Sequence, residues 1–122
     1  DFIPNVEYIE VSFKEDEENA MIKKLSLYNI DVSLLWSICP ETYCYTYYES
    51  WAAHTFIITN ELSGNIATQV QLNRNGIVLK NYEELDMLLD NKTKLERLIK
   101  DNKSTITNLK NNEEDILKIL NK

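Results

Sequence analysis

Residues 66–91 read IATQVQLNRNGIVLKNYEELDMLLDN and combine three local signals. Apolar and polar residues alternate over 66–72, and this period of two predicts a β-strand. The Asn-Gly pair at 75–76 is typical of a tight hairpin turn, and a short apolar run follows it. Asn81 then precedes a helical pattern as its N-cap. This stretch therefore predicts a β-hairpin that leads into a helix.

The size and charge of the chain limit its partners. Its 122 residues suffice for one domain that buries about two-thirds of its unfolded surface. A formal charge of −7 opposes binding to nucleic acids or anionic membranes, which require a cationic face. No apolar stretch approaches the length of a membrane span, and no basic flank precedes an apolar core near the start. We expect an intracellular protein, in the cytoplasm or nucleus, with a neutral or basic protein partner.

The sequence offers little for catalysis or metal binding. Cys39, Cys44 and His54 are too few for a structural zinc site, which needs about four ligands. The histidine would also have to activate one of the cysteines without a recognisable orienting motif. The cysteines fit reduced thiols in an intracellular protein, and a disulfide between them is the alternative. We therefore expect no catalytic site, no metal and no cofactor.

Elements before residue 66 are predicted from the same periodicities. Residues 6–13 alternate as in a strand, and an acidic turn opens a helix near 17–28. The apolar run 31–38 is typical of a strand that is buried on both faces. Residues 42–59 allow either two strands with a tight turn or a loop followed by one strand, and the strand pattern is clearer from Phe56 onward.

The chain keeps a helical pattern beyond about residue 92. One possibility is a coiled coil, and the other is two or three short helices with Asn112 capping the last. The seven-residue register for the coiled coil comprises Leu88, Leu95, Asn102, Leu109 and Ile116.

The hydrophobic period thus changes from about 3.6 to 2 and back along the chain. This change predicts an α+β domain over 1–122. An antiparallel sheet would lie between the helix near 17–28 and the helix near 82–90. Additional helices would extend the domain from about 92.

This order of elements resembles a Src homology 2 domain. The resemblance covers roughly residues 15–100 and implies a non-catalytic module that binds peptides. Within that family, the chain is most similar to the divergent tandem pair of a transcription elongation factor, which implies a phosphorylated linker of RNA polymerase II as the partner. The pieces that carry it are Ala20–Tyr28 as the first helix, SLLWSI (33–38) as the central strand, HTFIITNELSGNIATQVQL (54–72) as the next hairpin, and NGIVLKNYEELDMLL (75–89) as the small strand and second helix.

One departure from the family concerns phosphate. Phosphotyrosine is held by an arginine on the central strand, because a guanidinium fork binds two phosphate oxygens. This strand has Trp36 and Ser37 instead. We expect the ordinary phosphotyrosine pocket to be absent, unless lysines of the first helix reach across the sheet.

The aromatic run around residues 43–51 is the predicted binding face. Aromatic side chains with polar tips suit a protein interface, but they also fill strands as ordinary core residues. The histidine that follows would either donate to a bound group or serve as a scaffold residue. We predict that a protein or peptide partner, phosphorylated or not, contacts Tyr47, Trp51 and His54, with Lys23, Lys24 and Arg74 as the nearby cations.

Two other functions fit the composition. An acidic inhibitor or immunity-type protein would use the negative charge to cover a basic enzyme surface. A helical-tail oligomerisation domain would use Leu95, Leu109 and Ile116.

Overall fold

A computed structural model describes residues 5–11, 19–37 and 45–103 of the chain. Within these ranges, three strands form one parallel sheet in the order β1-β2-β3. The strands are β1 (Val32–Leu35), β2 (Phe56–Asn60) and β3 (Gly76–Leu79). The helices are α2 (Ala20–Leu27), α3 (Tyr45–Ala52), the short 3-10 helix η1 (Glu61–Ser63), α4 (Asn65–Asn73), α5 (Tyr82–Asp90) and a further helix at 92–103.

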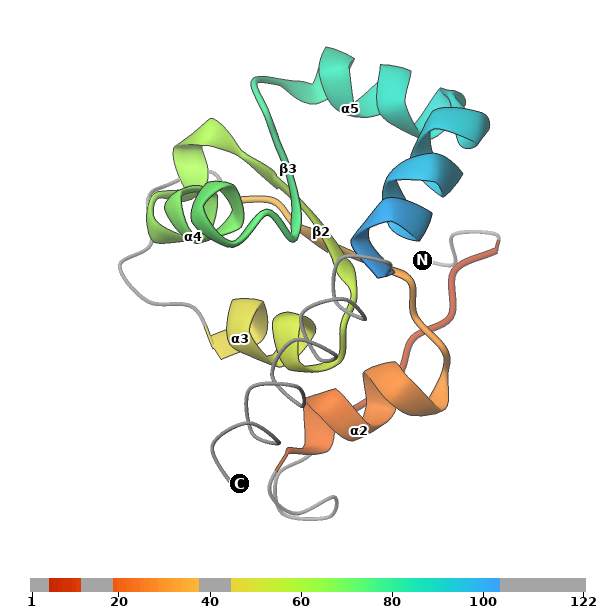
Figure 1. Cartoon of the computed structure of the whole chain (residues 1–122). Coiled ribbons are helices and arrows are strands. Elements are labelled where there is room, and N and C mark those ends of the chain that lie inside the picture. Colours follow the sequence, from red (N-terminus) through yellow and green to blue (C-terminus); the bar gives the residue numbers. More distant parts are fainter. Residues whose placement is uncertain (1–4, 12–18, 38–44, 104–122) are drawn as a thin grey trace, which may run out of the picture.

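Helices cover both faces of the sheet (Figure 1). The crossovers through α3 and α4 step across the sheet in the same direction, and the usual right-handed connection therefore places both helices on one face. The other face packs against α5 and the helix at 92–103. The remaining helix, α2, packs against α3.

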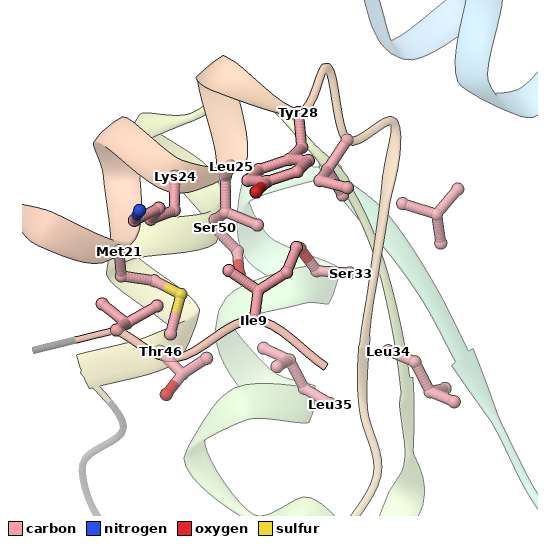
Figure 2. A pocket seen from close by; sticks show the side chains of 13 residues that line it. Ile9, Met21, Lys24, Leu25, Tyr28, Ser33, Leu34, Leu35, Thr46 and Ser50 are labelled. Carbon is pink, nitrogen blue, oxygen red and sulfur yellow. The ribbon is translucent and has the colours of Figure 1, made fainter. Parts of the chain in front are cut away.

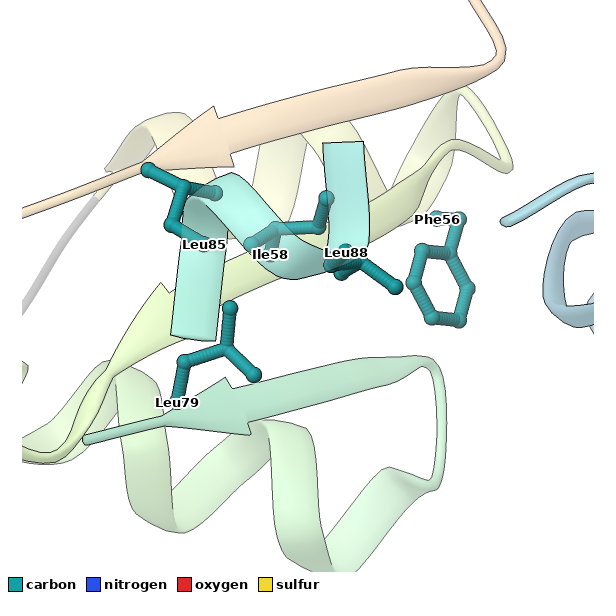
Figure 3. Close-up of a cluster of buried hydrophobic side chains, with 5 residues drawn as sticks. All are labelled: Phe56, Ile58, Leu79, Leu85 and Leu88. Carbon is teal, nitrogen blue, oxygen red and sulfur yellow. The ribbon is translucent and has the colours of Figure 1, made fainter. Parts of the chain in front are cut away.

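The central strand β2 anchors both halves of the core, and every one of its residues is buried. Phe56 and Ile58 point toward α5, where they meet Leu79, Leu85 and Leu88 (Figure 3). On the other face, the cluster consists of Tyr47, Ile57, Ile66 and Val70. Helices on both faces explain why FIIT is a continuous apolar run without alternation.

The predicted antiparallel sheet is wrong, because all three strands run parallel. The stretch 66–72, predicted as a strand, belongs to α4. Ile66 and Val70 are four residues apart, and this spacing satisfies a helix as well as an alternating strand. Leu72, which the strand pattern would have buried, is exposed.

The predicted hairpin at 75–76 is also absent, because α4 ends there and the chain enters β3. The left-handed residue is not Gly76 but Arg74, with φ 53° and ψ 37°, at the C-terminus of α4. Gly76 is instead required for space, because its Cα faces the Ile57 backbone.

Replacing Arg74 with glycine should stabilise the domain. A non-glycine residue in the left-handed region costs about 1–2 kcal/mol, and glycine avoids this cost. Glycine also raises the conformational entropy of the unfolded chain, which offsets part of the stabilisation. We expect Arg74→Gly to raise the free energy of unfolding in urea by about 0.5–1 kcal/mol. Gln71→Gly, inside the same helix, should lower it by about 1 kcal/mol. A loss of stability in both variants would contradict this account.

Several predicted elements are confirmed. Strands occur within 31–38 and from Phe56, and helices occur within 17–28 and at 82–90. Asn81 caps the last of these, since its Oδ1 accepts a hydrogen bond from the Glu84 backbone N–H at 3.0 Å.

Other predicted elements differ or lie outside the described residues. Residues 45–52, within the stretch predicted to be strand or loop, form α3, and the described segment 5–11 joins no sheet. β1 lies at the edge of the sheet and is only partly buried, since Ser33 is buried but Leu34 is 51% exposed. The helical extension is present at 92–103, while Cys39, Cys44 and everything after 103 lie outside the described residues.

One of the four pieces that carried the Src homology 2 resemblance differs, since its 54–72 hairpin is β2, η1 and α4, whereas the first helix, the strand predicted as central and the small strand with the second helix are present. No helix among the described residues has both the length and the apolar character needed to cross a bilayer.

Candidate functional site

The edge strand β1 has one side with which no other described strand pairs. Its neighbour β2 takes the backbone bonds on the other side, beginning with the Phe56 N–H, which donates to the Asp31 carbonyl at 2.8 Å. Alternate residues of a strand direct their backbone groups to opposite sides, so Val32 and Leu34 direct theirs to the open edge. Leu34 also leaves 51% of its surface exposed. An unpaired apolar edge of this kind is a template for another strand.

A groove lies directly beside this edge, between α2, α3, β1 and the extended segment 5–11 (Figure 2). It has a volume of about 310 Å³ and is largely apolar. We call it the β1 groove. Its lining residues are Ile9, Val11, Met21, Lys24, Leu25, Tyr28, Ile30, Val32, Ser33, Leu34, Leu35, Thr46 and Ser50.

Hydroxyl groups at the base of the β1 groove bond to one another. The Thr55 hydroxyl donates to the Ser50 carbonyl at 3.1 Å, and its oxygen lies 2.7 Å from the Ser33 hydroxyl. Since the threonine proton is used, the Ser33 hydroxyl is the donor in that pair. None of the described residues that line the groove is an acid or a histidine that could activate a serine. Most of these described lining residues are apolar and suit the binding of apolar side chains.

Charge is sparse in the β1 groove. Lys24 is the single charged residue among the described residues that line it, and Figure 2 shows its ammonium group beside Met21 on α2. Two of the large apolar side chains that line the groove are also exposed to solvent, namely Tyr28 and Leu34. Exposed apolar surface on a small domain commonly marks a protein-binding site.

The carboxyl ends of the strands, where parallel sheets often bind ligands, are occupied by internal bonds. The Asn60 amide donates to the Ser37 carbonyl at 2.6 Å and accepts from its N–H at 3.4 Å. The Trp36 and Tyr82 rings stack above, with centroids 5.1 Å apart. Because these bonds fix the loops, the β1 groove is the better candidate among the described surfaces.

The structure places Tyr47 and Trp51 side by side on α3 and His54 just after that helix, but it does not expose all three on one surface. Tyr47 is 1% exposed and lies in the core, where its hydroxyl accepts from the Asn73 and Asn75 amides at 2.8 and 3.1 Å. Trp51 is 41% exposed, and its ring lies 6.1 Å from that of Tyr47. His54 follows α3 with a φ of 61° and lines a different pocket, near the Lys103–Asp31 ion pair.

The predicted cations are also separated. Lys24 lines the β1 groove, while Lys23 is exposed on α2 and Arg74 ends α4. Among the described residues, no group of three His, Cys, Asp or Glu side chains could hold a metal ion.

The sequence contains one signal for the groove that the prediction of the binding site did not use. Segment 6–11 alternates, yet it has no turn that would pair it with the next strand. Instead of pairing in the sheet, the segment contributes Ile9 and Val11 to the lining of the groove.

Comparison of the chain with family models, curated proteins and solved structures gave no match.

Proposed function

We propose that this chain is a non-catalytic protein-binding module that holds an extended segment of a partner along β1. The partner's backbone would pair with the open side of the strand, and its apolar side chains would enter the β1 groove. Strand addition of this kind takes affinity from main-chain hydrogen bonds and specificity from pockets for alternate side chains. The observation that carries the proposal is the open edge at Leu34 beside an apolar groove.

The chemistry of the partner follows from the segment that already lines the groove. Ile9 and Val11 are two residues apart in an extended stretch, and both contribute side chains to the lining. A ligand with Ile, Val or Leu at every second position would match this spacing. The net charge of −7 favours a neutral or basic sequence around those residues. The groove holds one cation, so the proposal does not require a phosphorylated partner.

Selection from a library of random peptides displayed on phage tests the proposal. We expect the selected peptides to share alternating aliphatic residues. Leu34→Lys should weaken their binding about thirtyfold, because it removes an apolar contact and places a charge on the edge. The dissociation constant can be measured by fluorescence anisotropy of a labelled peptide.

Leu89→Lys is the matched control. Leu89 is also 51% exposed, but it lies on α5 and does not line the groove. Equal effects of the two substitutions would contradict the proposal. Sedimentation equilibrium identifies the other occupant: a dimer that Leu34→Lys abolishes would mean that a second copy, and not a partner peptide, pairs with β1.

A further inference from the structure

The segment 5–11 is attached to the domain by side chains rather than by backbone bonds. It is extended, and no backbone hydrogen bond joins it to β1 or to another described element. Ile9 is 37% exposed and lines the β1 groove together with Val11, whereas Val6 on the same segment is 42% exposed and does not line it. The contacts of Ile9 and Val11 in the groove are therefore mainly apolar, and Val11 also lines a second cavity beside α3.

Figure 2 shows the Ile9 side chain directed into the groove, in the space between α2 and β1. Met21 and Leu25 of α2 and Leu35 of β1 line the same space. An extended ligand that paired with β1 would direct its own alternate side chains into this space. The segment and the ligand would thus compete for the same apolar contacts.

We infer that segment 5–11 is a built-in competitor for the β1 groove. The inference rests on the proposed function, because it assigns a regulator to that same site. A partner peptide must displace the Ile9 and Val11 side chains before its own residues can enter. The apparent affinity for the peptide is the intrinsic affinity multiplied by the fraction of molecules in which the groove is free. Since no backbone bonds are lost, displacement requires only the exchange of apolar contacts.

The test uses the full chain with Ile9→Ser, which weakens the apolar contacts between segment 5–11 and the β1 groove. Val6→Ser is the matched control on the same segment. The probe is the dye 1-anilinonaphthalene-8-sulfonate, which fluoresces on apolar surfaces and whose sulfonate suits Lys24. We expect Ile9→Ser to bind the dye about fivefold more tightly than the wild-type chain, since the isoleucine side chain no longer competes for the groove. Val6→Ser should not differ from wild type.

Unchanged or weaker dye binding by Ile9→Ser would overturn the inference, because Ile9 would then be a wall of the groove. Circular dichroism melts must show that both variants stay folded, and Ile9→Ala is the milder substitution if the serine variant does not.

A second arm uses a selected peptide and separates the two proposals. If Ile9→Ser tightens peptide binding about fivefold and Leu34→Lys weakens it about thirtyfold, both proposals stand. If Leu34→Lys weakens binding about thirtyfold but Ile9→Ser also weakens it, the competitor is refuted while the proposed function survives. If peptide binding ignores both substitutions, the proposed function fails, and the dye still decides whether the segment covers the groove.

Discussion

Gly76→Ala should destabilise the domain by about 3 kcal/mol or more, because the added methyl group has no space. A Cβ at this position would overlap the carbonyl oxygen of Ile57 and lie 2.7 Å from its carbonyl carbon. Both groups belong to paired backbone, and Ile57 is a Cα partner of Gly76 in the sheet. Relief therefore requires β3 to move away from β2. Urea denaturation followed by circular dichroism measures the loss.

Val78→Ala is the control for this prediction, because it lies on the same strand and removes atoms instead of adding them. It should cost about 1 kcal/mol from the lost burial of two methyl groups. The parallel pairing of β2 with β3 would be in doubt if Gly76→Ala were as stable as the wild-type chain.

Tyr47→Ala should lower the free energy of unfolding by about 4 kcal/mol, as expected for removal of a fully buried aromatic ring. The ring packs between α3 and the sheet, in the cluster with Ile57, Ile66 and Val70. Its hydroxyl is also the acceptor for the Asn75 amide, whose oxygen has no hydrogen-bond partner within the described part of the structure. Differential scanning calorimetry would show the effect as a large fall in Tm.

Two companion variants separate packing from hydrogen bonding at this position. Tyr47→Phe keeps the ring and should cost about 1–2 kcal/mol, because the Asn75 amide loses its acceptor. Trp51→Ala should cost about 1 kcal/mol, since that side chain is already partly exposed. Similar losses for Tyr47→Ala and Trp51→Ala would show that the ring of Tyr47 is not core. The role of Trp51 in binding stays a prediction, and the stability of this variant makes it testable.

The elements with unambiguous local chemistry could be predicted from the sequence. Asn81 and the leucines after it specify α5, because a capping side chain and an apolar stripe both point to a helix. The run beginning at Phe56 specifies a buried strand. In both cases, one residue pattern fits only one element.

The direction of strand pairing could not be predicted, because it depended on whether residues 66–72 form a strand or a helix. With 66–72 as a strand, the Asn-Gly pair closes a hairpin and the sheet becomes antiparallel. With the same residues as α4, the connection is a crossover and the sheet becomes parallel. Tertiary burial of Ile66 and Val70 selects the helix, and no local signal reports that burial.

The candidate site was even harder to predict from local sequence patterns than the strand pairing. Lys24 was predicted as a cation near the aromatic run, whereas in the structure it lines the β1 groove, which the sequence did not predict. The other lining residues come from α2, α3, β1 and segment 5–11, which are distant in sequence. The groove exists because β1 is the edge of the sheet, and strand order is a property of the fold rather than of any segment.

Amide hydrogen exchange on β1 tests the central claim most directly. In the free chain, the N–H groups of Val32 and Leu34 face the open edge, whereas that of Ser33 faces β2. When a selected peptide is added, we expect nuclear magnetic resonance to show strong protection of the Val32 and Leu34 amides, with Ser33 little changed. A peptide that binds tightly while Val32 and Leu34 exchange as fast as before would contradict the claim that partners pair with this strand.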